Sequence, residues 1–106
     1  MKVEISVQGD TMVARCSGRL VAGVAGNLYD EVKPLLANSK RVVLDLTEVD
    51  QMDSLGLGTV MRLYVSAKSA GCQLELINLS KRVRELFSIT NVMSLFEVYG
   101  DHPRIP

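Results

Sequence analysis

The chain has 106 residues, of which 47% are hydrophobic and 23% charged, and twelve Lys and Arg balance twelve Asp and Glu. This length suits one globular domain, and the balanced charge argues against direct binding to nucleic acid or to an anionic membrane. The sequence contains no apolar run of about 18 residues and no apolar segment near its start, so we expect neither a membrane span nor a signal peptide.

The cysteines and the histidine limit the redox and metal chemistry that we expect. Cys16 and Cys72 lie far apart without CxxC spacing, which favours two free, buried thiols in a cytoplasmic protein. A disulfide would require Cα atoms within about 7 Å, and the sequence leaves this open. The single histidine, His102, lies in residues 101–106, which we expect to form a flexible C-terminal tail. We therefore expect no metal site and no cofactor.

The first part of the chain predicts a β-hairpin. Apolar and polar side chains alternate over residues 3–8, as in a half-buried strand. Gly9 and Asp10 form a turn pair, and residues 11–17 predict an antiparallel partner strand that ends at Gly18.

Residues 20–26 are apolar but include two glycines, each of which weakens a helix by about 1 kcal/mol relative to alanine. We interpret this segment as a loop, with Asn27 as the N-cap of a first helix. Pro34 falls within that helical pattern and should kink the helix or open a new first turn. The side chains predicted to face the core are Leu28, Val32, Leu35 and Leu36.

The centre of the chain predicts a buried strand followed directly by an amphipathic helix. Residues 42–46 are apolar at four of five positions, which is typical of a strand buried on both faces. Asp53 and Ser54 would lie between this strand and the helix, and Gly71 would end the helix. The apolar face of the helix is predicted to consist of Leu57, Val60, Met61, Tyr64 and Val65.

The remaining elements complete an alternating strand and helix order. Residues 73–77 predict a strand, and Ser80 is placed to cap a third helix with Val83, Leu86 and Phe87 facing inward. Residues 92–95 predict one short helical turn, and residues 96–99 a last edge strand. The sequence therefore predicts an α/β fold: a single mixed β-sheet of about five strands, with an antiparallel first hairpin, parallel later strands and helices mainly on one face.

Ser54 has both a structural and a functional interpretation. A serine that enters a helix most often serves as a cap, and Asp53 could share that role. Gly56 and Gly58 are costly in a first helical turn, which makes sense if another body approaches the backbone closely.

Three kinds of functional site could account for this segment. A dinucleotide fingerprint is weak, because Met61 stands where the third glycine would fall and the sequence has no P-loop. A hydrolase triad lacks the first glycine of a nucleophile elbow, and its only candidate base, His102, lies in the tail. A modified Ser54 remains. A phosphate there would meet free N–H groups at the positive helix end and would add about −1.5 to −2 charge beside Asp53.

Three segments carry a resemblance to a known family. Residues 43–46 (VLDL), 52–58 (MDSLGLG) and 83–87 (VRELF) resemble a STAS domain, most closely the single-domain bacterial anti-sigma factor antagonists. The likeness covers most of the chain, and we expect a STAS domain over residues 1–100. It implies a phosphorylation-controlled partner switch rather than an enzyme. In that family an anti-sigma factor serine kinase phosphorylates the serine matching Ser54, and a PP2C-type phosphatase reverses this. The unmodified form binds the kinase and releases the sigma factor.

The sequence departs from the family at the turn after the second strand. The family often reads Gly-Glu-Leu-Asp there, whereas this chain has an arginine and Val21 at the two acidic positions. This apolar stretch is either drift in a packed loop or a docking surface for another partner, and exposed residues from Leu20 to Val24 would also allow a homodimer.

Two functional hypotheses therefore remain. The first is a cytoplasmic partner switch with Ser54 as the phosphorylated residue. The second is a STAS scaffold subunit in a lipid-transport or stress-signalling complex, in which Ser54 is only a cap. The residues expected to bind a partner are Asp53, Ser54, Leu55, Gly56, Gly58, Leu20 and Val21.

Overall fold

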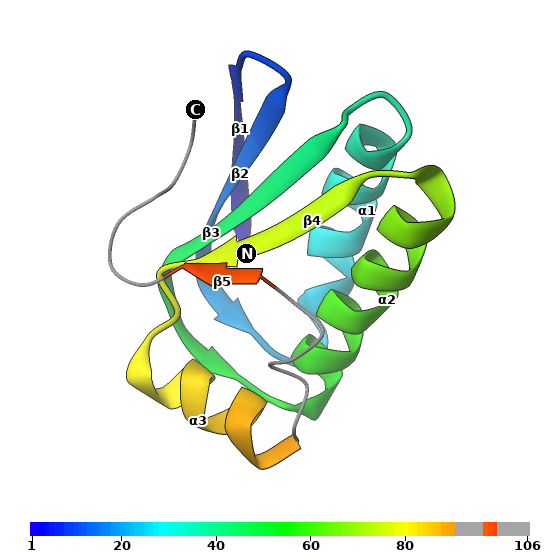
Figure 1. Cartoon of the computed structure of the whole chain (residues 1–106). Coiled ribbons are helices and arrows are strands. Elements are labelled where there is room, and N and C mark those ends of the chain that lie inside the picture. Colours follow the sequence, from blue (N-terminus) through cyan, green and yellow to red (C-terminus); the bar gives the residue numbers. More distant parts are fainter. Residues whose placement is uncertain (91–96, 100–106) are drawn as a thin grey trace.

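The computed structural model describes residues 1–90 and 97–99, which form one five-stranded sheet with three helices (Figure 1). The strands follow one another across the sheet in sequence order, β1-β2-β3-β4-β5. In chain order the elements are β1 (Lys2–Gln8), β2 (Thr11–Leu20), α1 (Ala25–Leu36), β3 (Arg41–Met52), α2 (Ser54–Ala70), β4 (Gln73–Ile77), α3 (Lys81–Thr90) and β5 (Glu97–Tyr99).

The pairing confirms the predicted mixed sheet. β1 and β2 form an antiparallel hairpin, and the pairs β2–β3, β3–β4 and β4–β5 are parallel. Parallel neighbours need a crossover connection, and α1, α2 and α3 lie in those connections. The hairpin is part of the sheet, and β1 is one of its two edge strands.

β2 and β3 both run further than predicted, and this places the end of β2 beside the start of α2. The register between the two strands shifts twice, between Arg15 and Ser17 and between Gly18 and Arg19. Gly18 has φ +113, a backbone conformation that only glycine adopts easily, so the strand continues through it instead of ending there. The last pair is Leu20 with Met52, which immediately precedes Asp53.

Helices α1 and α2 lie side by side over one face of the sheet, and α3 lies near one end of it (Figure 1). The helix-covered face holds the main core, which includes Leu28, Leu44, Val60 and Phe87, all fully buried. On the other face Val13, Val43 and Ile77 form a smaller buried cluster. Burial on both faces explains why residues 42–46 are almost continuously apolar.

The start of α1 differs from the prediction. The helix begins at Ala25, its N-cap position is Val24, and no side chain caps it. The amide groups of Val24 and Ala25 instead donate to the carbonyl of Val21, so a backbone turn leads into the helix. Asn27 is therefore not the N-cap; its side-chain amide donates to the carbonyl of Met1 at 3.1 Å and ties the N-terminus to α1. Pro34 lies inside the helix, which runs past it by two residues to Leu36.

The inward face of α2 is rotated relative to the prediction. Leu57 and Val60 are buried as expected, but Val65 is 60% exposed and Leu63 is fully buried. Because α1 packs along one flank of α2, the buried stripe turns toward that flank and leaves Val65 on the solvent side.

Two predicted helix ends and the cysteine prediction are confirmed. Gly71 ends α2 in a left-handed conformation with φ +71, and the Ser80 hydroxyl accepts the amide of Val83 at 3.2 Å at the start of α3. Cys16 and Cys72 are free and buried, and burial raises the pKa of the Cys16 thiol to about 12. The predicted helical turn at residues 92–95 and the tail at residues 101–106 lie outside the described residues.

Candidate functional site

The junction between β3 and α2 is capped by Asp53 and not by Ser54. Asp53 has an extended backbone, with φ −109 and ψ −175, and its Oδ1 accepts the amide of Leu55 at 3.0 Å and that of Gly56 at 2.9 Å. This is the usual geometry of an N-cap carboxylate. Ser54 is the first residue of the helix, so the interpretation of its hydroxyl as the cap is wrong.

Asp53 also holds the end of β2 against the start of α2. Its Oδ2 accepts the amide of Ala22 at 3.0 Å, and its own amide donates to the carbonyl of Leu20 at 3.3 Å. The N–H of Ala22, followed by that of Gly56, holds the pKa of the Asp53 carboxyl below its usual value, because both bonds favour the charged form. Asp53 therefore joins two segments that lie about thirty positions apart in sequence.

Ser54 is exposed on the first turn of α2, beside the Asp53 carboxylate. We expected a phosphate on Ser54 to meet free N–H groups, but those of Leu55 and Gly56 already donate to Asp53. A phosphate there would thus lie next to a carboxylate that occupies two of the helix-end donors. Its attraction to the helix dipole and its repulsion by Asp53 oppose each other, so the net effect on folding should be small.

Gly56 has a structural role inside the protein. A Cβ atom at this position would lie 1.9 Å from the carbonyl oxygen of Leu20, closer than any real contact. The expectation that Gly56 admits an outside body is therefore wrong: the body that approaches it is the end of β2. Leu20 is fully buried, because β2 continues into this packed junction, so its expected role in an exposed partner surface is also wrong.

The other predicted partner-binding residues reach the surface to different degrees. Leu55 is 62% exposed, Asp53 and Val21 are half-buried, and Gly58 has open space where a side chain would stand. The structure therefore brings Asp53, Ser54, Leu55, Gly58 and Val21 to one accessible end of the molecule and removes Leu20 and Gly56 from it.

The sequence gives little or no signal for two contacts at or near the site. The amide of Ala22 contacts Asp53, and no sequence signal points to it, since any residue except proline carries an amide. The guanidinium carbon of Arg62 lies 4.0 Å from the centre of the Tyr29 ring on α1, and the Tyr29 hydroxyl hydrogen-bonds with that of Ser66 at 3.3 Å. This hydrogen bond and Lys33 lower the pKa of Tyr29. In the sequence, the spacing of four between Arg62 and Ser66 is the only hint that they share a partner.

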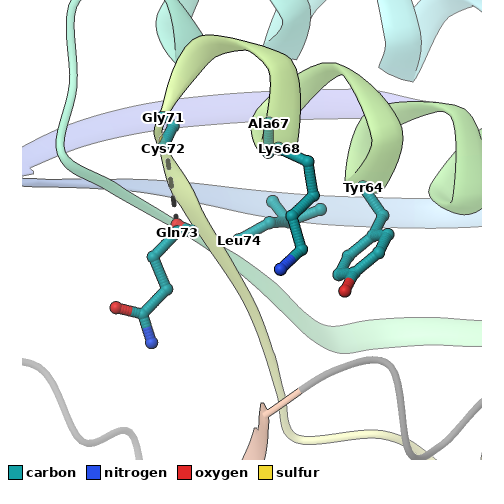
Figure 2. Close-up of a pocket in the computed structure, with 7 residues that line it drawn as sticks. All are labelled: Tyr64, Ala67, Lys68, Gly71, Cys72, Gln73 and Leu74. Carbon is teal, nitrogen blue, oxygen red and sulfur yellow. Dashed lines mark hydrogen bonds between the residues drawn. The ribbon is translucent and has the colours of Figure 1, made fainter.

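A cavity of about 480 Å³ lies at the opposite end of α2 (Figure 2). Its lining residues are Tyr64, Ala67, Lys68, Gly71, Cys72, Gln73 and Leu74. Lys68 lies 5.6 Å from the centre of the Tyr64 ring, and both side chains extend from α2 on the same side (Figure 2). The lining residues begin at Tyr64, in the second half of α2, so the cavity is not part of the junction at Ser54. Residues 1–90 and 97–99 contain no cluster of three groups suited to a metal ion.

The fold and the junction define a small α/β domain with one mixed sheet and an exposed serine at the start of its second helix. The sequence model of the STAS domain family matches residues 2–104, and the chain belongs to that family. None of the helices in the described part of the chain has the length and apolar content of a membrane span.

Similar proteins include bacterial regulators. A STAS-domain containing protein of Pseudomonas aeruginosa (strain UCBPP-PA14) is 28% identical over 93 residues, which covers 88% of this chain and 92% of that protein. The anti-sigma-B factor antagonist of Bacillus subtilis (strain 168) is 26% identical over 98 residues, covering 92% and 90%. The unphosphorylated Bacillus anti-sigma factor antagonist SpoIIAA has the same fold, with a TM-score of 0.77 at 18% identity, covering 92% of this chain and 88% of that one.

Proposed function

We propose that this chain is an anti-sigma factor antagonist whose binding to an anti-sigma factor serine kinase is controlled by phosphorylation of Ser54. The unmodified form binds the kinase, and the bound kinase releases its sigma factor. Phosphorylation ends this binding, and a PP2C-type phosphatase restores it. The chain acts in the cytoplasm by changing partners and catalyses no reaction itself.

The observation that carries this proposal is the division of roles between Asp53 and Ser54. Asp53 supplies the cap and the contact to Ala22, so the exposed Ser54 hydroxyl is not needed to hold the junction together. A kinase can therefore modify Ser54 without opening the core. The names of the relatives support the same role, since one is an anti-sigma-B factor antagonist. SpoIIAA, with the same fold, has also been solved in a phosphorylated form.

The surface around Ser54 supports docking of a protein partner. Leu55, Gly58, Arg62 and Val65 are spaced by three or four residues and form the outer stripe of α2, opposite its buried residues. Leu55 and Val65 are apolar and at least 60% exposed, and Gly58 between them leaves room for a partner side chain. A new phosphate at the end of this stripe would place an unpaired anion in the contact and weaken it.

Ser54→Asp and Ser54→Ala provide the first test. We expect Ser54→Asp to weaken kinase binding about tenfold or more, on the scale of one repulsive interface charge, and Ser54→Ala to bind like the unmodified chain. Neither variant should move the thermal midpoint much, because Ser54 makes no part of the cap. Calorimetric titration with a candidate anti-sigma factor serine kinase from the source organism measures both affinities. Equal affinities of the two variants would contradict the switch.

A second experiment separates the switch from a constitutive STAS scaffold. The purified chain is incubated with that kinase and ATP, and its intact mass is measured. We expect the addition of one phosphate to the native chain, none to Ser54→Ala, and removal by a PP2C-type phosphatase. A native chain that stays unmodified would favour the scaffold hypothesis.

A further inference from the structure

β1 forms one edge of the sheet that the structure describes, because it pairs with β2 alone among the described strands (Figure 1). All seven residues, Lys2–Gln8, pair with β2 in continuous register, without a bulge or a proline. A regular edge strand presents a row of unpaired backbone N–H and C=O groups, onto which another strand can add.

The side chains on one face of β1 are apolar, and two of the three are exposed. Val3, Ile5 and Val7 lie on the same face as the helices, because their register partners Cys16 and Ala14 belong to the helix-covered core. The helices do not cover β1 along its whole length, since Ile5 is 39% exposed and Val7 66% exposed. Exposed β-branched side chains beside an unpaired strand edge form a surface suited to protein contact.

The sequence of β1 is complementary to itself in antiparallel pairing. With Ile5 opposite Ile5 of a second copy, all seven residues of each strand are paired. Val3 then lies opposite Val7, so one face becomes a continuous apolar ladder. On the other face Lys2 lies opposite Gln8 and Glu4 opposite Ser6, so no like charges oppose each other directly.

The neighbouring symmetric registers are worse. A register centred on Glu4 places the two Glu4 carboxylates directly opposite each other, which destabilises a strand pair. A register centred on Ser6 leaves Lys2 and Val3 of both strands unpaired and shortens the apolar ladder. The charges and the apolar pattern therefore select a second copy of this chain, in one register, as the occupant of the edge.

We propose that this protein forms a homodimer through antiparallel pairing of two β1 strands, with Ile5 at the two-fold axis. The contact joins two five-stranded sheets into one continuous sheet and keeps the helices of both copies on the same side. It differs from the dimer surface that the sequence suggested at residues 20–24, where Leu20 is buried but Ala22, Gly23 and Val24 are exposed. The proposal does not depend on phosphorylation of Ser54, which lies on α2 and not on β1.

Light scattering on a size-exclusion column, over a series of protein concentrations, tests the dimer. We expect a mass of two chains at high concentration, and a mass of one chain at the same concentrations for Ile5→Lys and Val7→Lys. Val65→Lys is the matched control, since Val65 is also apolar and 60% exposed but lies on α2, and this variant should stay dimeric. A native chain that is monomeric throughout, or a dimer lost only in Val65→Lys, would overturn the proposal.

Cysteine cross-linking tests the register, and it also covers the case in which a lysine variant fails to fold. Directly opposite residues in an antiparallel pair have Cα atoms about 4.5–5.5 Å apart, within disulfide range, whereas diagonal neighbours are about 7–8 Å apart. We expect Ile5→Cys to form a cross-linked dimer under mild oxidation and Ser6→Cys to form little or none. The native Cys16 and Cys72 are buried and should not interfere. Equal cross-linking of both variants, or of neither, would contradict this register.

Discussion

The two ends of helix α2 differ in how many parts of the chain hold them. At the N-terminal end, Asp53 accepts amides from its own helix and from Ala22, and Gly56 lies against the carbonyl of Leu20. At the C-terminal end, Gly71 closes the helix locally, through hydrogen bonds to carbonyls of the last turn, and a cavity of about 480 Å³ borders it.

This difference indicates why the N-terminal end suits a switch. The end of β2, the end of β3 and the start of α2 hold one another at this point. The backbone there keeps its shape when the exposed Ser54 hydroxyl is modified, so the modification changes the surface and not the fold. Near the C-terminal end, the tertiary contact is a backbone hydrogen bond, from the amide of Gln73 in β4 to the carbonyl of Lys40 at 2.9 Å. We therefore expect substitutions of the framing residues to affect stability, most strongly where the frame is tightest.

Gly56→Ala should have the largest effect. Its Cβ would fall 1.9 Å from the Leu20 carbonyl oxygen, and since that oxygen belongs to backbone, β2 or α2 must shift. We expect a loss of about 3 kcal/mol in the free energy of unfolding, at the upper end of overpacking costs. Urea denaturation followed by circular dichroism measures this loss as a lower midpoint.

Gly58→Ala is the matched control for this substitution. It lies in the same helical turn, but an added Cβ meets nothing within 4 Å. Alanine also favours the helix over glycine, so we expect a gain of about 0.5–1 kcal/mol. Losses of similar size at both positions would show that helix propensity, and not the contact with Leu20, makes Gly56 necessary.

At the other end of α2 a smaller loss is expected for Gly71→Ala. Gly71 has φ +71, which costs an L-residue about 1–2 kcal/mol, but no neighbour crowds its missing Cβ. Gly71→Asn should lose less, because asparagine tolerates the left-handed conformation better. The same denaturation experiment measures both variants. If Gly71→Ala cost more than Gly56→Ala, the N-terminal end would not be the more constrained of the two.

Much of the fold could be predicted because it depends on local patterns. The apolar run at residues 42–46, the C-cap at Gly71 and the cap at Ser80 each follow from neighbouring residues, and the structure confirms all three. The position of Ser54 at the start of a helix and on the surface could be predicted in the same way, because the apolar residues change from a strand pattern to helical spacing after the buried strand.

The predictions that were wrong concern residues whose contacts are with a distant segment of the chain. The sequence shows two glycines in a first turn but not that the end of β2 packs against only one of them. It shows an asparagine near a helix start but not the carbonyl of Met1 that Asn27 contacts instead. Val65 fits an apolar spacing, yet the packing of α1 beside α2 decides which flank of the helix is buried. Such contacts depend on tertiary structure, which local periodicity does not encode.

Asp53→Asn should have the smallest effect on stability, and its pH dependence identifies the cause. The N–H of Ala22, followed by that of Gly56, lowers the pKa of Asp53 below its usual 3.8. Because the folded pKa is the lower one, the carboxylate stabilises the fold above the unfolded pKa, and this contribution is lost as the pH falls through the folded value. We therefore expect the thermal midpoint of the native chain to exceed that of Asp53→Asn by a few degrees at neutral pH, and the gap to close below the usual carboxyl range.

Asp50→Asn, at an exposed position on β3, is the control and should stay close to the native chain at neutral pH. Thermal denaturation of the three proteins across acidic and neutral pH measures the comparison. A gap for Asp53→Asn that stays constant down to acid pH would mean that the asparagine only fits the cap poorly. The charge of Asp53 would then contribute nothing to holding β2 against α2, and the rigid frame around Ser54 would depend on Gly56 and Leu20 alone.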